Sequence, residues 1–421
     1  MNSLRPGSIH DPVIETEPPE HRHARLDAAL VEAVRLAFRS APRARRTLEA
    51  AGLRPGDVRG QDDLPRIPVT RKDALVALQA EEPPFAGLAA VDPGALARIY
   101  ASPGPILDPQ GTDGDCWRLR HAMAAAGFRA GDVVLNSASY HLTPGGFMVD
   151  GGARALGCAV IPGGTAQTEL QLRVASALRA TAYTGMPSFL FHLLQRARET
   201  AVPLGFEVAF VFGEMLPESL RADIQAFGVR CLQGYPTADL GCLAYECTHM
   251  GGWHLHPGVI VEVLDLETGR AAEPGQPGEI VATSLDPAYP LLRFATGDVG
   301  ALAPPAPCPC GRTAPKLAGI LGRVGDAVKV KGMFVRGAQV EGVLRGFPEA
   351  GRFRATVTRE EHVDLLAYEV EVEDPRIPGL GERIAVALQE AVKVRGAVRF
   401  VPRGALGEGG KRIDDRRRWD R

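Results

Sequence analysis

The sequence predicts an α/β protein: a large N-terminal domain with a mostly parallel sheet and a β-rich portion, then a small α+β domain. Three observations support this fold class. Short apolar runs alternate with helical patterns between residues 132 and 236, alternating β runs follow Gly251, and mixed strands and helices follow Gly325. A chain of 421 residues also exceeds the usual size of one domain.

The region before the alternating segment is predicted to be largely helical. Residues 26–51 have helical apolar spacing, and residues 64–77 predict an extended segment leading to a helix capped at Thr70. Residues 99–111 predict a short strand that runs into a proline- and glycine-rich loop. Residues 112–127 then return to a helical pattern.

The alternating region is expected to form the parallel part of the sheet. Its expected strands are residues 132–139, 158–164, 181–187, 208–214 and 229–236. Its expected helices are residues 145–157, 168–180, 188–200 and 216–228. Ligands of such sheets bind beyond the carboxyl ends of the strands, so the loops after these strands are candidate sites.

The remaining sequence predicts a hairpin and a separate domain. Residues 259–285 read as two alternating runs joined by a long turn. After Gly322–Gly325, four strands and two helices are expected, at residues 328–335, 352–359, 365–374, 397–403, 339–347 and 379–394. We therefore expect a loosely ordered polar tail over residues 1–25, an N-terminal domain over 26–322 and a C-terminal domain over 323–421.

Composition excludes several classes of function. The formal net charge of −2 gives no sign of nucleic-acid binding, and no apolar run is long enough to span a bilayer. The N-terminal residues lack the apolar stretch of a signal peptide, so we expect a cytoplasmic protein with reduced thiols. Cys116, Cys158 and Cys231 stand in apolar surroundings and are expected to be buried thiols.

Other cysteines suggest a metal centre. Cys247, Cys308 and Cys310 together with His254 offer three sulfurs and one imidazole, which suit tetrahedral Zn²⁺. A closed four-ligand site of this kind would be structural. Free reduced thiols are the alternative, and His249 and His256 are rivals for the imidazole position.

Several motifs in order carry a family resemblance. PAYPLLRFATGDVG, PCPCGRTAPKL, GRVGDAVKVKGMFV and the region around GYPTADLG resemble the phenylacetate–CoA ligases, within the superfamily of acyl-CoA ligases, adenylation domains and luciferases. The similarity extends from about Arg66 to the end of the chain. It implies a large N-terminal domain and a small mobile C-terminal lid.

The resemblance implies an enzyme that uses ATP and Mg²⁺ to convert a carboxylic acid, aryl or short acyl, into an acyl-AMP. The acyl group would then pass to CoA. The expected partners are therefore a small-molecule acid and CoA or another acyl acceptor, without nucleic acid or membrane. A homodimer is left open.

The same resemblance assigns nucleotide contacts. Asp298 would accept the ribose hydroxyls, and Arg323 would contact ribose or phosphate. Asp239 stands where the family has the glutamate that holds Mg²⁺, and an aspartate can serve that ion too. The resemblance also places Tyr235 and Thr237 near adenine and phosphate, and Gly213, Glu214 and Met215 along the adenine. Each assignment has a structural alternative. Asp298 could be a turn aspartate that bonds its own backbone, Arg323 could form an ion pair at the domain boundary, and residues 213–215 could be a simple strand-to-helix turn.

Further assignments concern the acid and the thiol. Lys411 matches the family lysine that meets the acyl carboxylate and α-phosphate, with a solvated tail lysine as the alternative. Lys331 and Gly332 would line the thiol tunnel. The acid pocket would include Tyr140, His141, Gly185, Met186 and Pro187, although aromatic residues near them are equally consistent with core.

The phosphate loop departs from the family pattern. The family has a loop rich in serine, threonine and glycine with a lysine, whereas this chain has YASPGPILDP over residues 100–109. Prolines remove amide donors, and Asp108 adds a negative charge. Two alternatives follow: a nucleotide-, CoA- or acyl-adenylate-binding protein that no longer uses ATP, and an adenylating enzyme that transfers to an amine or carrier protein. Gly325 also replaces an acidic hinge residue.

Overall fold

The computed structural model describes residues 5–102, 105–325, 327–360, 362–407 and 412–417. The chain forms two compact units. The first comprises Met1–Phe212 and Arg221–Leu321, and the second comprises Gly213–Leu220 and Gly322–Arg421. Lys411, which the resemblance places in catalysis, lies outside the described residues, as do Pro103 and Gly104 of the divergent phosphate loop.

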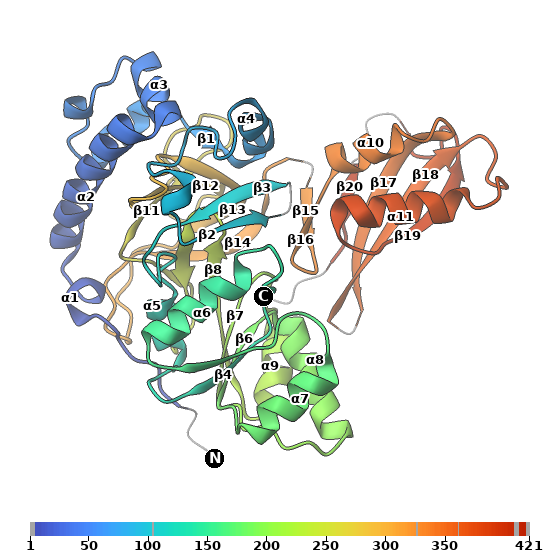
Figure 1. Cartoon of the computed structure of the whole chain (residues 1–421), viewed down its shortest axis with the longest axis horizontal. Helices are drawn as coiled ribbons and strands as arrows, with labels where there is room; N and C mark the ends of the chain where they lie inside the picture. The colour runs from blue at the N-terminus through green and yellow to red at the C-terminus, as the bar shows by residue number, and fades with distance from the viewer. Residues whose placement is uncertain (1–4, 103–104, 326, 361, 408–411, 418–421) are drawn as a thin grey trace. The chain divides into compact units, whose positions relative to one another are not determined.

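The first unit is built on a 12-stranded sheet (Figure 1). Its strands are β1 (Thr70–Arg71), β4 (Val133–Asn136), β5 (Ala159–Pro162), β6 (Ala182–Gly185), β7 (Val208–Val211), β8 (Arg230–Thr237), β9 (Gly241–Tyr245), β10 (Trp253–Leu255), β11 (Val259–Leu264), β12 (Gly278–Ser284), β13 (Phe294–Leu302) and β14 (Lys316–Arg323). The order is β11-β12-β13-β14-β10-β9-β8-β7-β6-β4-β5, with β1 beside β13. Strands β4 to β8 pair in parallel. The pairs β8–β9, β9–β10, β10–β14, β11–β12 and β12–β13 are antiparallel.

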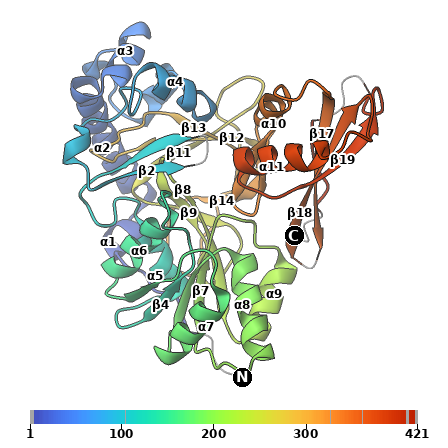
Figure 2. The same ribbon diagram turned by 45° about the vertical axis from the view of Figure 1, so that its right-hand side comes forward.

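Helices cover this sheet. They are α1 (Pro12–Glu15), α2 (Pro19–Ser40), α3 (Pro42–Ala50), α4 (Leu75–Glu81), α5 (Leu119–Ala126), α6 (Gly145–Ala155), α7 (Thr168–Ala177), α8 (Pro187–Glu199) and α9 (Glu218–Ala226). Figures 1 and 2 show α5 and α6 on one side of the parallel strands and α7 and α8 on the other. The parallel strands β6 and β7 are buried along their whole length, which explains the continuous apolar sequence VAFV of β7. The predicted α/β fold class is confirmed.

The segment around the expected phosphate loop is a hairpin. β2 (Arg98–Ser102) pairs in antiparallel with β3 (Ile106–Gln110), whereas the sequence predicted one strand followed by a loop. Pro109 is tolerated in β3 because each strand of a two-stranded sheet is an edge strand. Asp108 faces Tyr100 across this hairpin.

The N-terminal segment, expected to be a loose tail, is bound to the first unit from Arg5 onward. The Arg5 guanidinium is buried and lies 2.7 Å from the Asp132 carboxylate. Glu15, at the end of α1, is also buried and lies 2.6 Å from Arg312. Polar composition suggested disorder, but these long-range ion pairs give the segment specific partners. Helix α2 also begins at Pro19, earlier than expected.

The second unit is a small α+β structure, as predicted. Its elements are β15 (Ala327–Val330), β16 (Met333–Arg336), α10 (Gly337–Leu344), β17 (Ala350–Glu360), β18 (Val363–Val372), α11 (Leu380–Val392), β19 (Ala397–Pro402) and β20 (Ile413–Asp415). Four strands form a sheet in the order β19-β18-β17-β20, and β15 pairs with β16. α11 buries Leu380, Ile384 and Leu388 at helical spacing, as expected for a helix packed on a sheet. Within the described residues, no helix is long and apolar enough to cross a membrane.

Candidate functional site

Two predicted nucleotide residues meet in the first unit. Tyr235 comes from β8 and Asp298 from β13, and the Tyr235 hydroxyl donates a 2.6 Å hydrogen bond to Asp298 Oδ2. Gly297, just before Asp298, has φ of +75°, a conformation that glycine adopts without strain. The Asp298 amide also donates to Thr296 Oγ1 at 3.1 Å. Backbone and tyrosine together therefore orient this carboxylate, as ribose binding would require.

Asp239 lies in the turn that joins β8 to β9. Its carboxylate is buried and forms an ion pair with the Lys72 ammonium. The other oxygen, Oδ1, has no hydrogen-bond partner among the described residues. Thr237 Oγ1 accepts the Leu240 amide at 3.2 Å, and Trp117 donates to the Ala238 carbonyl at 3.0 Å. The turn is thus held rigidly, and Thr237 contributes to that rigidity.

Asp108 is the least expected feature of this region. Its carboxylate is 1% exposed, and neither oxygen has a partner with hydrogen-bond geometry in the described part of the chain. Burial raises the pKa of Asp108 to about 7; the Asp239 carboxylate adds to that rise, whereas Lys72 and Ser102 oppose it. Asp108, Asp239 and Lys72 therefore act on one another electrostatically.

Sequence reasoning missed Lys72. It lies 167 positions from Asp239, and it follows β1, the two-residue strand beside β13. No local pattern distinguishes it from a solvent-exposed lysine. The sequence feature closest to Lys72 is Thr70, two residues earlier, where an extended segment was expected to become a helix.

The predicted acid-pocket residues lie after β4 and β6 but differ in environment. The Tyr140 hydroxyl accepts a 2.6 Å hydrogen bond from Asn136, and its ring meets Phe147 edge-on at 5.0 Å. His141, by contrast, is exposed. On the second loop, the Met186 carbonyl accepts the Tyr183 hydroxyl at 3.2 Å. Pro187 begins α8, and Gly185 is tightly packed, since an added Cβ would meet the Tyr183 hydroxyl at 2.6 Å.

The second unit holds the other predicted residues. Lys331 and Gly332 form the two-residue turn between β15 and β16, and both have positive φ, at +48° and +79°. That geometry is typical of a tight hairpin turn and favours glycine at the second position. Gly325, the replacement for an acidic hinge residue, also has positive φ, at +80°. The second unit also contains Gly213, Glu214, Met215 and Arg323.

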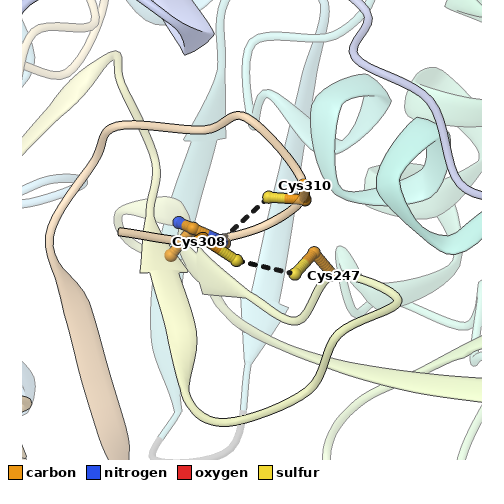
Figure 3. A group of neighbouring side chains, drawn as sticks. Cys247, Cys308 and Cys310 are labelled. Atoms are coloured by element: carbon orange, nitrogen blue, oxygen red, sulfur yellow. Dashed lines mark hydrogen bonds between the residues drawn. The ribbon is translucent and has the colours of Figure 1, made fainter. Parts of the chain in front are cut away.

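The cysteine–histidine cluster comprises Cys247, His254, Cys308 and Cys310. Its ligand atoms all lie within 4.8 Å of one another. Cys247 Sγ is 3.6 Å from Cys308 Sγ, and Cys310 Sγ is 3.4 Å from His254 Nε2. A tetrahedral zinc ion with bonds of about 2.3 Å would place sulfur ligands about 3.8 Å apart, so these separations fit such an ion. Figure 3 shows the three cysteine side chains gathered in this way.

The surroundings of this cluster favour a thiolate at Cys310, whereas Cys310 and burial raise the pKa of Cys247. Lys316 Nζ lies 3.3 Å from Cys308 Sγ, and the Arg312 amide donates to Cys310 Sγ at 3.4 Å. Cys247 and then His254 lower the pKa of Cys310, and the thiolate is the form that binds metal. His254 Nδ1 lies 3.3 Å from the Ala314 carbonyl, which can orient the ring with Nε2 toward the sulfurs.

The two rival histidines do not join the cluster. His249 is exposed at the turn after Cys247. His256 is buried, but its Nε2 lies 3.1 Å from His121 Nδ1, and its Nδ1 accepts the Gly258 amide at 2.9 Å. Both ring nitrogens of His256 therefore have other partners, and His254 is the imidazole that meets the sulfurs.

Comparisons with known proteins place this chain among acid–CoA ligases. No family model matches the sequence. A phenylacetate-coenzyme A ligase of Thermus thermophilus is 32% identical, over 96% of this chain and 98% of its own length. The corresponding ligase of Aromatoleum evansii is 28% identical over 92% and 90%. The crystal structure of 2-hydroxyisobutyryl-CoA ligase with 2-HIB-AMP and CoA is 25% identical, with a TM-score of 0.88 over 96% of this chain and 92% of that one.

Proposed function

Because this chain belongs to the phenylacetate–CoA ligase family, we propose that it joins a carboxylic acid to CoA at the expense of ATP. The relatives that carry this proposal cover nearly the whole chain. The observation that best supports it within the structure is the Tyr235–Asp298 pair, in which a half-buried carboxylate within β13 is oriented by the tyrosine hydroxyl. That arrangement suits the two hydroxyls of a ribose.

The proposed reaction has two steps. A carboxylate oxygen of the acid attacks the α-phosphorus of ATP, and the bond from that phosphorus to the pyrophosphate oxygen breaks, giving acyl-AMP and pyrophosphate. The sulfur of CoA then attacks the acyl carbonyl carbon, the thiol proton is lost, and AMP leaves. Lys411 would stabilise charge in the first step, and Lys331 and Gly332 would line the path of the thiol.

Two metals accompany this proposal. Oδ1 of Asp239, which is buried without a hydrogen-bond partner among the described residues, suits Mg²⁺, which would neutralise the ATP phosphates when bound. The cysteine–histidine cluster suits a structural Zn²⁺, because all four positions are filled by protein atoms and no position remains for substrate. That ion would fix the loop before β14 to the strands β9 and β10.

The acid is proposed to be aryl or short acyl. Tyr140 and Phe147 offer an apolar edge, and Gly185 permits close approach of the chain at the second loop.

The test is ATP–pyrophosphate exchange by the full chain across a panel of acids, including phenylacetate, benzoate and 2-hydroxyisobutyrate. We expect exchange with at least one acid and CoA-dependent release of AMP with the same acid. A folded protein that exchanges pyrophosphate with none of them would overturn the proposal.

One observation favours a second function, a binding protein that does not use ATP. Asp108 places a buried carboxylate where the family offers hydroxyls and amides to the phosphates. Calorimetry distinguishes the two functions: binding of CoA or ATP without exchange or AMP release would favour the second.

A further inference from the structure

Two buried aspartates lie together at the edge of the first unit's nucleotide region. Asp108 is 1% exposed on β3, and Asp239 is 6% exposed after β8; we call them the acidic pair. Ile106 of β3, Leu240 directly after Asp239, and Tyr289 belong to one buried core cluster, so the hairpin and the turn that carry the two aspartates lie in the same region. The hairpin that carries Asp108 thus brings a second carboxylate to the proposed Mg²⁺ ligand.

When both carboxylates are ionised, the acidic pair carries more negative charge than Lys72 balances. Lys72 forms an ion pair with Asp239, and one ammonium offsets only one of two carboxylates. Both oxygens of Asp108 and Oδ1 of Asp239 are buried without a hydrogen-bond partner among the residues described. Burying ionised oxygens without a partner is costly, so this arrangement suits a ligand that brings positive charge.

We propose that Asp108 and Asp239 together hold the divalent cation that accompanies ATP, with Asp108 as a ligand that the family motif does not supply. This proposal rests on the proposed function for the presence of ATP. A hard divalent cation such as Mg²⁺ binds carboxylate oxygens, keeps some waters and shares the rest of its coordination with phosphates. Three unpartnered carboxylate oxygens are ligands of that kind.

The chain's departure at the phosphate loop supports this assignment. Prolines at 103, 105 and 109 remove backbone donors that would otherwise hold phosphate oxygens directly. A cation held on the same hairpin attracts the phosphates in another way, because its charge acts on them without a backbone amide. The carboxylate of Asp108, which would repel phosphates alone, then becomes part of their binding site.

The test is a Mn²⁺ titration of the full chain, with free Mn²⁺ followed by electron paramagnetic resonance, first without nucleotide and then with ATP. We expect Mg²⁺ to compete with Mn²⁺. Asp108→Asn and Asp239→Asn should each weaken Mn²⁺ binding by about 10-fold or more, since each removes a charged ligand. Asp265→Asn, which changes a turn carboxylate that accepts hydrogen bonds from Thr268 after β11, should leave Mn²⁺ binding unchanged.

Two results would overturn the proposal. One is a folded Asp108→Asn protein that binds Mn²⁺ as tightly as the wild-type chain, with and without ATP. The other is a wild-type chain that binds no Mn²⁺ under either condition. Circular dichroism of each variant verifies the fold, and asparagine keeps the shape of aspartate.

The same experiments separate this proposal from the proposed function. Pyrophosphate exchange with unchanged Mn²⁺ binding in Asp108→Asn rejects the second carboxylate ligand and leaves the ligase. Mn²⁺ binding that depends on Asp108, without exchange for any acid, supports the cation site and rejects the ligase.

Discussion

The cysteine–histidine cluster and the acidic pair are both buried groups of metal-type ligands, but they are built differently. In the cluster, each ligand atom lies near another, and Lys316 and the Arg312 amide supply positive charge and a donor to the sulfurs. In the acidic pair, one lysine serves two carboxylates, and three oxygens have no partner in the described residues. The first arrangement suits a permanent ion, and the second suits an ion that comes and goes with a ligand.

The two regions also differ in how they connect to the fold. Arg312, two residues after Cys310, binds buried Glu15 and donates to the Ser8 carbonyl at 2.6 Å. The loop that bears two sulfurs therefore also holds the N-terminal segment. The acidic pair sits on a hairpin and a turn, and the segment of Lys72, which Asp239 contacts, is also held by the pairing of β1 with β13. This contrast predicts that damage to the cluster affects folding, whereas damage to the acidic pair affects ligands.

The largest effect is expected from Cys308→Ser. Removing one of four zinc ligands should lower the zinc content from about one ion per chain to near zero and reduce the free energy of unfolding by several kcal/mol. Plasma mass spectrometry measures the metal, and denaturant unfolding measures the stability. Cys158→Ser is the matched control, because serine can keep the hydrogen bond that Cys158 donates to the Arg129 carbonyl.

The contrast between the cluster and the acidic pair is wrong if Cys308→Ser and Cys158→Ser have the same free energy of unfolding and the wild-type chain carries no metal. The four residues would then be reduced thiols and an ordinary buried histidine, which is the alternative that the sequence left open.

An intermediate effect is expected from Asp298→Ala. Loss of a carboxylate that accepts ribose hydroxyls should weaken nucleotide binding by about 10- to 100-fold, the equivalent of about 1.5–3 kcal/mol for hydrogen bonds to a charged group. Calorimetry with ATP measures this. Tyr235→Phe removes only the hydroxyl that orients Asp298 and should have a smaller effect. Equal ATP affinity in Asp298→Ala and the wild-type chain would exclude the ribose assignment.

The parallel strands and the cysteine–histidine cluster could be predicted because the sequence patterns that indicate them are local. The alternation of short apolar runs and helices gave the parallel strands, and Cys308 and Cys310 with two upstream ligands gave a metal cluster that the structure brings together. The sequence named His254 as the imidazole ligand and left His249 and His256 as rivals, and the structure places His254 with the three cysteines. Only the contact with His121 shows that His256 is occupied elsewhere.

Other features depend on contacts between distant residues. Glu15 reads as part of a polar N-terminus, yet it is buried against Arg312, 297 positions away. Lys72 and Asp239 have no shared motif. Asp108 was read correctly as a charge unsuited to phosphates, but its burial beside a second carboxylate depends on the pairing of β2 with β3, which the prolines concealed.

The smallest effect, and the one with opposite sign, is expected from Asp108→Asn without added divalent cation. Replacing a buried, unpartnered carboxylate with a neutral amide should raise the free energy of unfolding by about 1–3 kcal/mol. Asp132→Asn is the control, because Asp132 is equally buried but paired with Arg5 at 2.7 Å, and that change should destabilise the chain. Added Mn²⁺ should reduce the difference in the free energy of unfolding between Asp108→Asn and the wild-type chain, since the cation stabilises only the protein that binds it. If Asp108→Asn is instead destabilising to the same degree as Asp132→Asn, the carboxylate is a satisfied structural group, and the contrast between the two regions disappears.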